Sequence, residues 1–300
     1  MRHLLGLEEL CAGDITAILD DAKRFKDLHH KQPGHDSLAG KTVVMLFFEP
    51  STRTSSSFAT AARRLGAELI SVTGNASSVV KGETLADTAR NVLAMAGDVV
   101  VVRHRYSGTP RALARALRVP IVNAGDGMHE HPTQGLLDIF TLREKLGRIE
   151  GLHVGIVGDI AHSRVARSNI HGLLKLGARV TLVGPPTLIP PQIEKLGVSV
   201  SNSLDETLPA LDAVNMLRIQ NERLAGALIP SQQEYSDRYQ LNARRLDLLP
   251  YHAIVMHPGP MNRGVEISSD VADGPRSVIL QQVTNGVFVR MAVLQRAVND

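Results

Sequence analysis

The chain has 300 residues, of which 43% are hydrophobic and 21% charged, and its formal net charge is +3. These values suit a globular protein with a large core, and the length fits two domains better than one. Only 3% of the residues are aromatic and Trp is absent, which disfavours the exposed stacking platforms of nucleic-acid-binding proteins. The single cysteine, Cys11, excludes an internal disulfide and a cysteine-based zinc cluster.

The N-terminal segment turns acidic too early for a secretory signal. No stretch approaches the roughly eighteen uninterrupted apolar residues that a membrane span needs. We therefore expect a cytoplasmic protein that binds neither a membrane nor nucleic acid. A small positive excess also suits anionic small-molecule substrates.

Short apolar runs alternate with amphipathic segments along the chain. The predicted strands are 42–48, 68–72, 99–104, 121–124, 153–157, 179–183, 213–216 and 253–256. The predicted helices are 55–65, 84–95, 110–116, 133–146, 164–176 and 279–298. Several strands are continuously apolar, as expected where both faces of a sheet are covered. The alternation predicts an α/β fold with parallel sheets flanked by helices.

The elements form two sets, and the long helix 133–146 joins them. We expect a first domain of residues 1–132 together with the C-terminal helix 285–300, which packs back on it. Residues 133–284 then form the second domain. Because ligands of parallel sheets bind beyond the carboxyl ends of the strands, the polar residues that follow each strand are the candidates for a site.

Hydroxyl groups and one arginine follow the first predicted strand, where Ser51, Thr52, Arg53 and Thr54 enter a helix. Helix N-terminal N–H groups bind phosphate well, and Ser51 or Thr52 also suits an ordinary N-cap. A cation in a first helical turn opposes the helix dipole, so Arg53 favours a bound anion there.

Further cations and a histidine follow later strands. Arg103 ends one strand of the first set, and His131 and Gln134 open the helix after another. In the second set Arg164 and Arg218 follow two strands, and paired guanidinium groups suit a dicarboxylate. Each of these side chains alone would also fit an ordinary surface or structural role. The second set lacks a full Gly-x-Gly-x-x-Gly fingerprint, which disfavours a nicotinamide-dependent dehydrogenase.

The string FFEPSTRT at 47–54 resembles the carbamoyl-phosphate signature of the aspartate and ornithine carbamoyltransferases, and HPTQ at 131–134 resembles their second signature. The similarity covers nearly the whole chain in block order and spacing. Segments 80–88, 162–168 and 218–223 resemble the aspartate branch. The ornithine branch carries a His-Cys-Leu-Pro string where this chain has HPGP at 257–260.

The resemblance implies a role for each matching residue. Carbamoyl phosphate would contact Ser51, Thr52, Arg53, Thr54, Arg103, His131, Gln134, Gly259 and Pro260. L-Aspartate would contact Lys81, Arg164, Arg218 and Gln220. Lys81 and a loop serine, Ser77 or the adjacent Ser78, would come from a neighbouring subunit of a homotrimer. Arg53, Thr54, Lys81, Arg103 and His131 would be the catalytic set.

The resemblance implies no cofactor and no metal, and it places the reaction early in de novo pyrimidine biosynthesis. A larger dodecameric assembly with dihydroorotase-like or regulatory chains is a further possibility. Two alternatives remain open from the residues: a carbamoyltransferase for ornithine or a related amine, and a non-catalytic scaffold. A cationic acceptor fits poorly with Arg164 and Arg218, and a scaffold would typically have lost these side chains.

Overall fold

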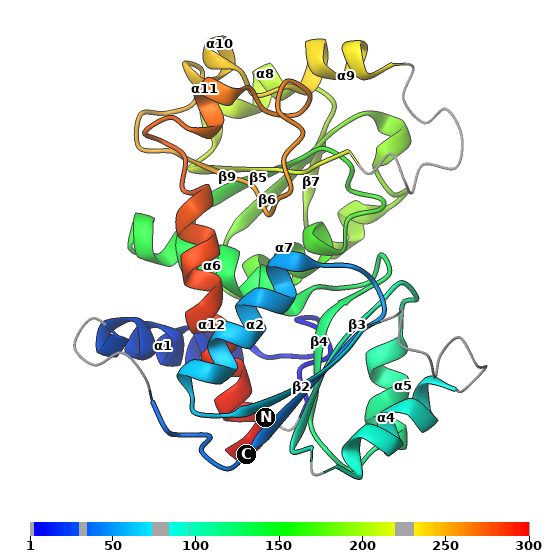
Figure 1. The fold of residues 1–300 in the computed structure, drawn as a ribbon. Coiled ribbons are helices and arrows are strands. Elements are labelled where there is room, and N and C mark those ends of the chain that lie inside the picture. Colours follow the sequence, from blue (N-terminus) through cyan, green and yellow to red (C-terminus); the bar gives the residue numbers. More distant parts are fainter. Residues whose placement is uncertain (1–2, 30–34, 74–83, 96, 220–230, 300) are drawn as a thin grey trace. The chain divides into compact units, whose positions relative to one another are not determined.

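The structure, a computed structural model, describes residues 3–29, 35–73, 84–95, 97–219 and 231–299. The chain divides into two compact units, residues 1–137 with 284–300, and residues 138–283. Each unit holds one parallel sheet flanked by helices, so the predicted fold class is confirmed (Figure 1). No described helix is both long and apolar enough to span a bilayer.

Unit 1 is built on a four-stranded sheet in the order β2-β1-β3-β4. Its strands are β1 (Thr42–Phe47), β2 (Glu68–Thr73), β3 (Val99–His104) and β4 (Ile121–Asp126). Its helices are α1 (Ala12–His29), α2 (Thr52–Arg64), α4 (Leu85–Leu93) and α5 (Thr109–Ala116), together with most of α12 (Ile279–Asn299). Every residue of β1 and β4 is buried, which explains their continuous apolar runs.

Helices cover both faces of this sheet. Alternate residues of β1 and β3, such as Val44 and Val100, pack in one cluster with Ala89 of α4 and Leu113 of α5. Helices α2 and α12 lie on the other face (Figure 1). There Arg290 donates a hydrogen bond to Ser57 Oγ at 2.8 Å, which fixes the C-terminal helix to unit 1.

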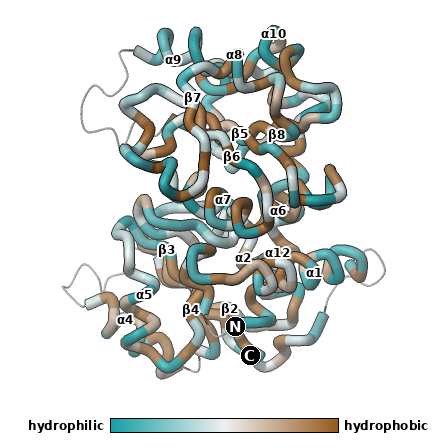
Figure 2. The backbone as a smooth tube through the Cα atoms, turned by 180° about the vertical axis from the view of Figure 1, so that it is seen from behind, coloured by the Kyte–Doolittle hydropathy of each residue, from teal (hydrophilic) through white to brown (hydrophobic). Residues whose placement is uncertain are grey.

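Unit 2 is built on a five-stranded sheet in the order β7-β6-β5-β8-β9. Its strands are β5 (His153–Val157), β6 (Arg179–Val183), β7 (Ser199–Ser201), β8 (Ala213–Met216) and β9 (Ile254–Met256). Its helices include α7 (Arg164–Lys175), α8 (Leu204–Thr207), α9 (Gln232–Tyr239), α10 (Ala243–Leu246) and α11 (Ser269–Ala272). Short 3-10 turns occur at Pro186–Leu188, Ile193–Leu196 and Leu208–Ala210. Hydrophobic stretches follow the strands of both sheets (Figure 2).

Helix α6 (Pro132–Leu146) begins in unit 1 and continues into unit 2, and α12 spans the other boundary. The predicted strands 99–104, 153–157, 179–183 and 213–216 match the observed ones residue for residue. Strand β9 begins at Ile254 instead of 253, and α2 begins at Thr52 instead of 55. Hydroxyl-rich residues 52–54 are therefore helical and form the first turn of α2.

Candidate active site

The strand order of unit 1 reverses direction between β1 and β3. From β1 the chain passes to β2 on one side, and then to β3 and β4 on the other. In open parallel sheets a ligand binds outside the carboxyl ends of the strands at such a reversal. The register pairs Phe47 with Arg103, so the turn that leads into α2 lies one strand away from Arg103. The sheet therefore brings together two of the predicted phosphate-binding segments.

The first turn of α2 has the features of an anion-binding helix terminus. Ser51 occupies the N-cap position, but its side chain makes no capping hydrogen bond. The first turn contains no acidic residue, and the partial positive charge of the helix N-terminus is therefore not offset there. Arg53 in this turn is exposed and Thr54 is buried. This arrangement can bind a phosphate group through N–H, hydroxyl and guanidinium donors.

Arg103 is held at the end of β3 by contacts from both neighbouring strands. Its Nη2 donates to Glu49 Oε1 at 3.1 Å, and its Nη1 donates to the carbonyl oxygen of Ala124 at 3.2 Å. Glu49 follows β1 and Ala124 belongs to β4, so the guanidinium is fixed across three strands. Its relative exposure is 9%, which leaves this cation in a largely desolvated position. Electrostatic attraction to an anion is stronger in such surroundings than in water.

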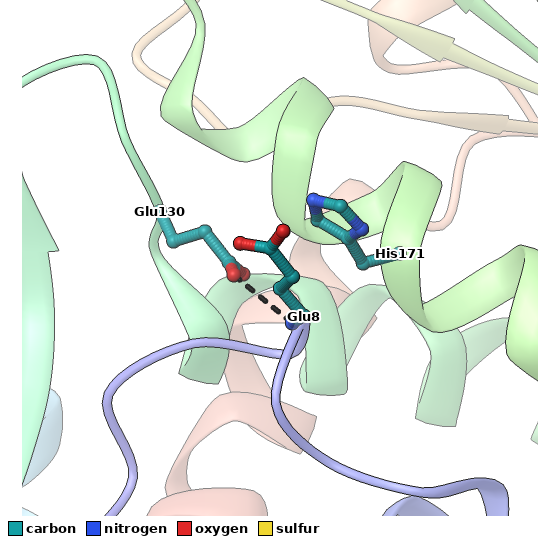
Figure 3. Close-up of side chains that lie close together, drawn as sticks. All are labelled: Glu8, Glu130 and His171. Carbon is teal, nitrogen blue, oxygen red and sulfur yellow. Dashed lines mark hydrogen bonds between the residues drawn. The ribbon is translucent and has the colours of Figure 1, made fainter. Parts of the chain in front are cut away.

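Two buried carboxylates shape the loop between β4 and α6. Asp126 accepts N–H bonds from Gly108 at 2.7 Å and from Glu130 at 3.2 Å. Glu130 in turn accepts from the backbone N–H of Leu7 at 2.8 Å. It also accepts from the backbone N–H of Glu8 at 3.1 Å (Figure 3). These bonds tie the N-terminal segment to the residue that immediately precedes His131.

His131 and Gln134 open helix α6 beside this loop. The backbone N–H groups of Gln134 and Gly135 both donate to the carbonyl oxygen of His131, at 2.9 and 3.1 Å. Pro132 takes the first helical position, where its missing N–H has no consequence. His131 and Gln134 have relative exposures of 5% and 9%, so both are held in a largely buried first turn.

Unit 2 has its own reversal of strand order, between β5 and β8. The turn after β5 contains Asp159, which is fully buried and accepts from His162 Nδ1 at 2.8 Å and from His162 N at 3.2 Å. Ser163 then caps α7 by accepting the N–H of Ala166 at 3.1 Å. Arg164 is the first residue of α7 and has a relative exposure of 7%. The ordered turn fixes the base of its side chain.

The neighbouring strand supplies the second predicted arginine of unit 2. Arg218 lies two residues after the end of β8 and is partly buried. Leu217 beside it donates its N–H to the carbonyl oxygen of Val157 at 2.8 Å, which connects the ends of β8 and β5. Gly259 and Pro260 follow β9, the next strand, and are joined by a cis peptide bond. Arg164, Arg218 and this pair thus leave one edge of one sheet.

Ser77, Ser78, Lys81 and Gln220 lie outside the described residues. No role was predicted from the sequence for Glu49, the partner of Arg103. Its position directly after β1 is the signal that would have identified it, because the carboxyl ends of β1 and β3 are adjacent.

Each unit thus places arginine side chains beyond the carboxyl ends of its strands at a strand reversal, an arrangement typical of two-domain α/β enzymes that act on anionic small molecules. Residues 2–144 match the family model of the aspartate/ornithine carbamoyltransferase carbamoyl-P binding domain. Residues 150–297 match that of the aspartate/ornithine carbamoyltransferase Asp/Orn binding domain. The chain belongs to the aspartate/ornithine carbamoyltransferase family.

Similar proteins with curated names include two aspartate carbamoyltransferase catalytic subunits. The one from Syntrophotalea carbinolica is 55% identical over 297 residues, covering 98% of this chain and 94% of that protein. The one from Halothermothrix orenii is 56% identical over 304 residues, covering 100% and 97%.

Solved structures give the same family. An aspartate transcarbamoylase from Trypanosoma cruzi in complex with N-(phosphonacetyl)-L-aspartic acid has a TM-score of 0.91 at 34% identity, covering 98% of this chain and 95% of that one. The catalytic subunit of M. jannaschii aspartate transcarbamoylase has a TM-score of 0.89 at 36% identity, covering 100% and 99%.

Proposed function

We propose that this chain transfers the carbamoyl group of carbamoyl phosphate to the amine of L-aspartate, giving N-carbamoyl-L-aspartate and phosphate. The observation that carries the choice of acceptor is the placement of Arg164 and Arg218 at one strand reversal of unit 2. Two guanidinium groups match the two carboxylates of aspartate. The relatives named above bear the same activity in their names. The reaction is an early step of de novo pyrimidine biosynthesis.

Unit 1 binds the donor in this proposal. Ser51, Thr52, Arg53 and Thr54 hold the phosphate at the N-terminus of α2. Arg103 contacts both the phosphate and the carbamoyl oxygen. His131 and Gln134 contact the carbamoyl end of the molecule. Gly259 and Pro260 of unit 2 contribute main-chain contacts.

The chemistry needs no covalent intermediate, because carbamoyl phosphate already carries a good leaving group. The neutral amine of aspartate attacks the carbamoyl carbon, and negative charge develops on the carbonyl oxygen. Thr54, Arg103 and His131 stabilise that charge as an oxyanion hole does; losing one such donor typically lowers kcat by about a hundredfold or more. The C–O bond to phosphate then breaks, and the departing phosphate accepts the amine proton. Arg53 and the helix N-terminus offset the charge on the phosphate.

A comparison of acceptors tests this function. Purified protein with carbamoyl phosphate should release phosphate with L-aspartate and form N-carbamoyl-L-aspartate. L-Ornithine should give only background release, because its side-chain cation would face Arg164 and Arg218. Activity with ornithine alone would refute the proposal, and inactivity with both amino acids would favour a non-catalytic scaffold.

The proposed assembly is a cytoplasmic homotrimer in which Lys81 and Ser77, or the adjacent Ser78, act in the site of a neighbouring subunit. Lys81→Ala and His131→Ala chains should each be inactive alone. Mixed trimers of the two should regain partial activity, since some sites then contain both intact residues. Verified hybrids without activity would refute shared sites. Higher assembly with dihydroorotase-like or regulatory chains would appear as a larger particle when such chains are added.

A further inference from the structure

A fully buried carboxylate in unit 2, Asp138 of α6, receives three side-chain amides. Its Oδ2 accepts from Asn169 Nδ2 at 2.8 Å, and its Oδ1 accepts from Gln282 Nε2 at 2.7 Å. Asn215 Nδ2 makes a longer contact of 3.4 Å with Oδ2. Burying a carboxylate is unfavourable unless hydrogen bonds replace its hydration, and these amides provide that replacement.

The network continues from Gln282 to the turn after β9. Gln282 Oε1 accepts the backbone N–H of His257 at 3.0 Å. His257 Nδ1 accepts the N–H of Gly259 at 2.8 Å, so its proton resides on Nε2. That Nε2 donates to Glu266 Oε1 at 3.0 Å, and Glu266 is fully buried. Hydrogen bonds through Gln282 and His257 therefore connect Asp138 with the peptide N–H of Gly259.

The three amides that donate to Asp138 lead to three segments of unit 2 with proposed substrate contacts, two of them for aspartate and one for carbamoyl phosphate. Asn169 lies in α7, about one and a half turns after Arg164 at its start. Asn215 lies in β8, three residues before Arg218. Gln282 leads through His257 to Gly259 and Pro260. We infer that Asp138 is a positioning residue, which sets the relative placement of the groups that bind aspartate.

The hydrogen-bond donors and acceptors of this network fit only one orientation of its amide side chains. A carboxylate accepts and cannot donate, so each amide must present its NH₂ group to Asp138. Gln282 is thereby oriented with its oxygen toward the N–H of His257. A change of Asp138 to asparagine would place an NH₂ group against at least one of these NH₂ donors. An apolar residue would leave all three amides without this acceptor.

This polarity supplies a sharp test, which rests on the proposed aspartate reaction. In Asp138→Asn, one hydrogen bond of the network is replaced by two donors that face each other. In Gln282→Glu, one hydrogen bond is replaced by two acceptors that face each other. In the double variant the new amide at position 138 donates to the new carboxylate at position 282, which still accepts from His257. The carboxylate and amide have exchanged places, and the total charge is the same as in the unchanged chain.

We expect each single variant to raise the KM for aspartate about tenfold, the effect of a lost bond of roughly 1.4 kcal/mol. The KM for carbamoyl phosphate should change less than the KM for aspartate, since most of the proposed donor contacts lie in unit 1. The double variant should return the aspartate KM to within about threefold of the original value. Should Asp138→Asn fail to fold, Asn169→Ser, which shortens one donor, supplies the same measurement.

Asp205→Asn is the matched control, because Asp205 accepts from Arg244 at 2.7 Å and Arg245 at 2.5 Å in the same unit. It should lower the Tm and leave the aspartate KM unchanged. Unchanged aspartate KM in the Asp138 and Gln282 single variants, or no recovery in the double variant, would overturn the positioning role. Loss of the proposed function would appear differently, as an unchanged chain that forms no N-carbamoyl-L-aspartate.

Discussion

Arg103 Nη2 donates to Glu49 Oε1 at 3.1 Å, and this ion pair joins the ends of two neighbouring strands, β1 and β3. The Glu49 side chain is 21% exposed and the Arg103 side chain 11%, so solvent screens the pair only in part. Together with the bond to Ala124 O, the pair sets the plane of the guanidinium. A guanidinium that acts on a developing negative charge must be oriented before the reaction begins.

Replacing Glu49 should therefore have its main effect on kcat and a smaller effect on the free energy of unfolding. Removing a hydrogen bond to a charged group costs about 1.5–3 kcal/mol, so Glu49→Ala should lower kcat roughly ten- to a hundredfold. Glu49→Gln should have a smaller effect because its amide oxygen can still accept. Steady-state kinetics with Glu68→Ala, an exposed glutamate at the start of β2, provides the control. Equal kcat for Glu49→Ala and the unchanged chain would contradict this role.

Arg53 should have opposite effects on stability with and without phosphate. A cation in a first helical turn is unfavourable by about 0.3–1 kcal/mol, so Arg53→Ala should be slightly more stable in phosphate-free buffer. Inorganic phosphate should raise the Tm of the unchanged chain and raise that of Arg53→Ala much less. Arg63→Ala, at the other end of α2, should keep the full response to phosphate. An equal response in both variants would exclude Arg53 from the phosphate site.

The parallel sheets were predictable because most of their strands are buried on both faces. Strand β3 begins with four consecutive valines, and all of its residues except His104 are buried. Strand β7 (Ser199–Ser201) was missed, since three partly exposed residues at a sheet edge carry no apolar run. Helix α1 was also missed although Ile15, Ile18, Leu19 and Ala22 recur at helical spacing.

Site residues at strand ends were predictable for a geometric reason, whereas the residues that hold them were not. Arg103, Arg164 and Arg218 were identified because carboxyl ends of parallel strands share one edge. Asp138 lies in the middle of α6, where an aspartate normally indicates a solvated helix face. Its buried position depends on Asn169 and Gln282, which are 31 and 144 residues away in the chain. No local pattern contains that information.

Gly158 should tolerate no side chain. Its φ is +130°, and a Cβ there would lie 2.7 Å from the carbonyl oxygen of Leu217, the residue before Arg218. Gly158→Ala should lower the free energy of unfolding by about 1–3 kcal/mol and raise the aspartate KM by displacing Arg218. Gly147→Ala separates the two causes, because Gly147 has φ +77° and no atom within 4 Å. Gly147→Ala should lower the free energy of unfolding and leave the aspartate KM unchanged. An unchanged aspartate KM in Gly158→Ala would contradict the displacement of Arg218.

Arg164 should govern aspartate affinity and leave donor affinity nearly unchanged. Hydrogen bonds to charged groups contribute about 1.5–3 kcal/mol, so Arg164→Ala should raise the aspartate KM roughly ten- to a hundredfold. Arg164→Lys should retain only part of the original aspartate affinity, since an ammonium cannot make the bidentate contact. Arg167→Ala, an exposed position on the same helix, is the control. A donor KM that changes as much as the aspartate KM would argue against a specific role.

Two histidines near the donor half-site should respond to pH with opposite signs. The hydrogen bond to Asp126, aided by the charges of Asp126, Glu130 and Glu8, raises the pKa of His129 above 6.5 despite its burial. Its contribution to stability is complete below pH 6.5 and is lost as the pH rises through the folded-state pKa. The difference in free energy of unfolding between the unchanged chain and His129→Asn should therefore be larger at about pH 5.5 than at about pH 8.5.

Burial, reinforced by the charge of Arg105, instead lowers the pKa of His104 below 6.5. Its Nδ1 accepts the N–H of Tyr106 at 3.1 Å, and protonation of that nitrogen would break the bond. The neutral ring is therefore favoured in the folded state, and the benefit is lost as the pH falls below the unfolded-state value. The difference in free energy of unfolding between the unchanged chain and His104→Asn should therefore be smaller at acid pH than at neutral pH. Urea unfolding at both pH values measures the difference in free energy of unfolding for each variant. A pH dependence of the same sign for His129→Asn and His104→Asn would contradict these assignments.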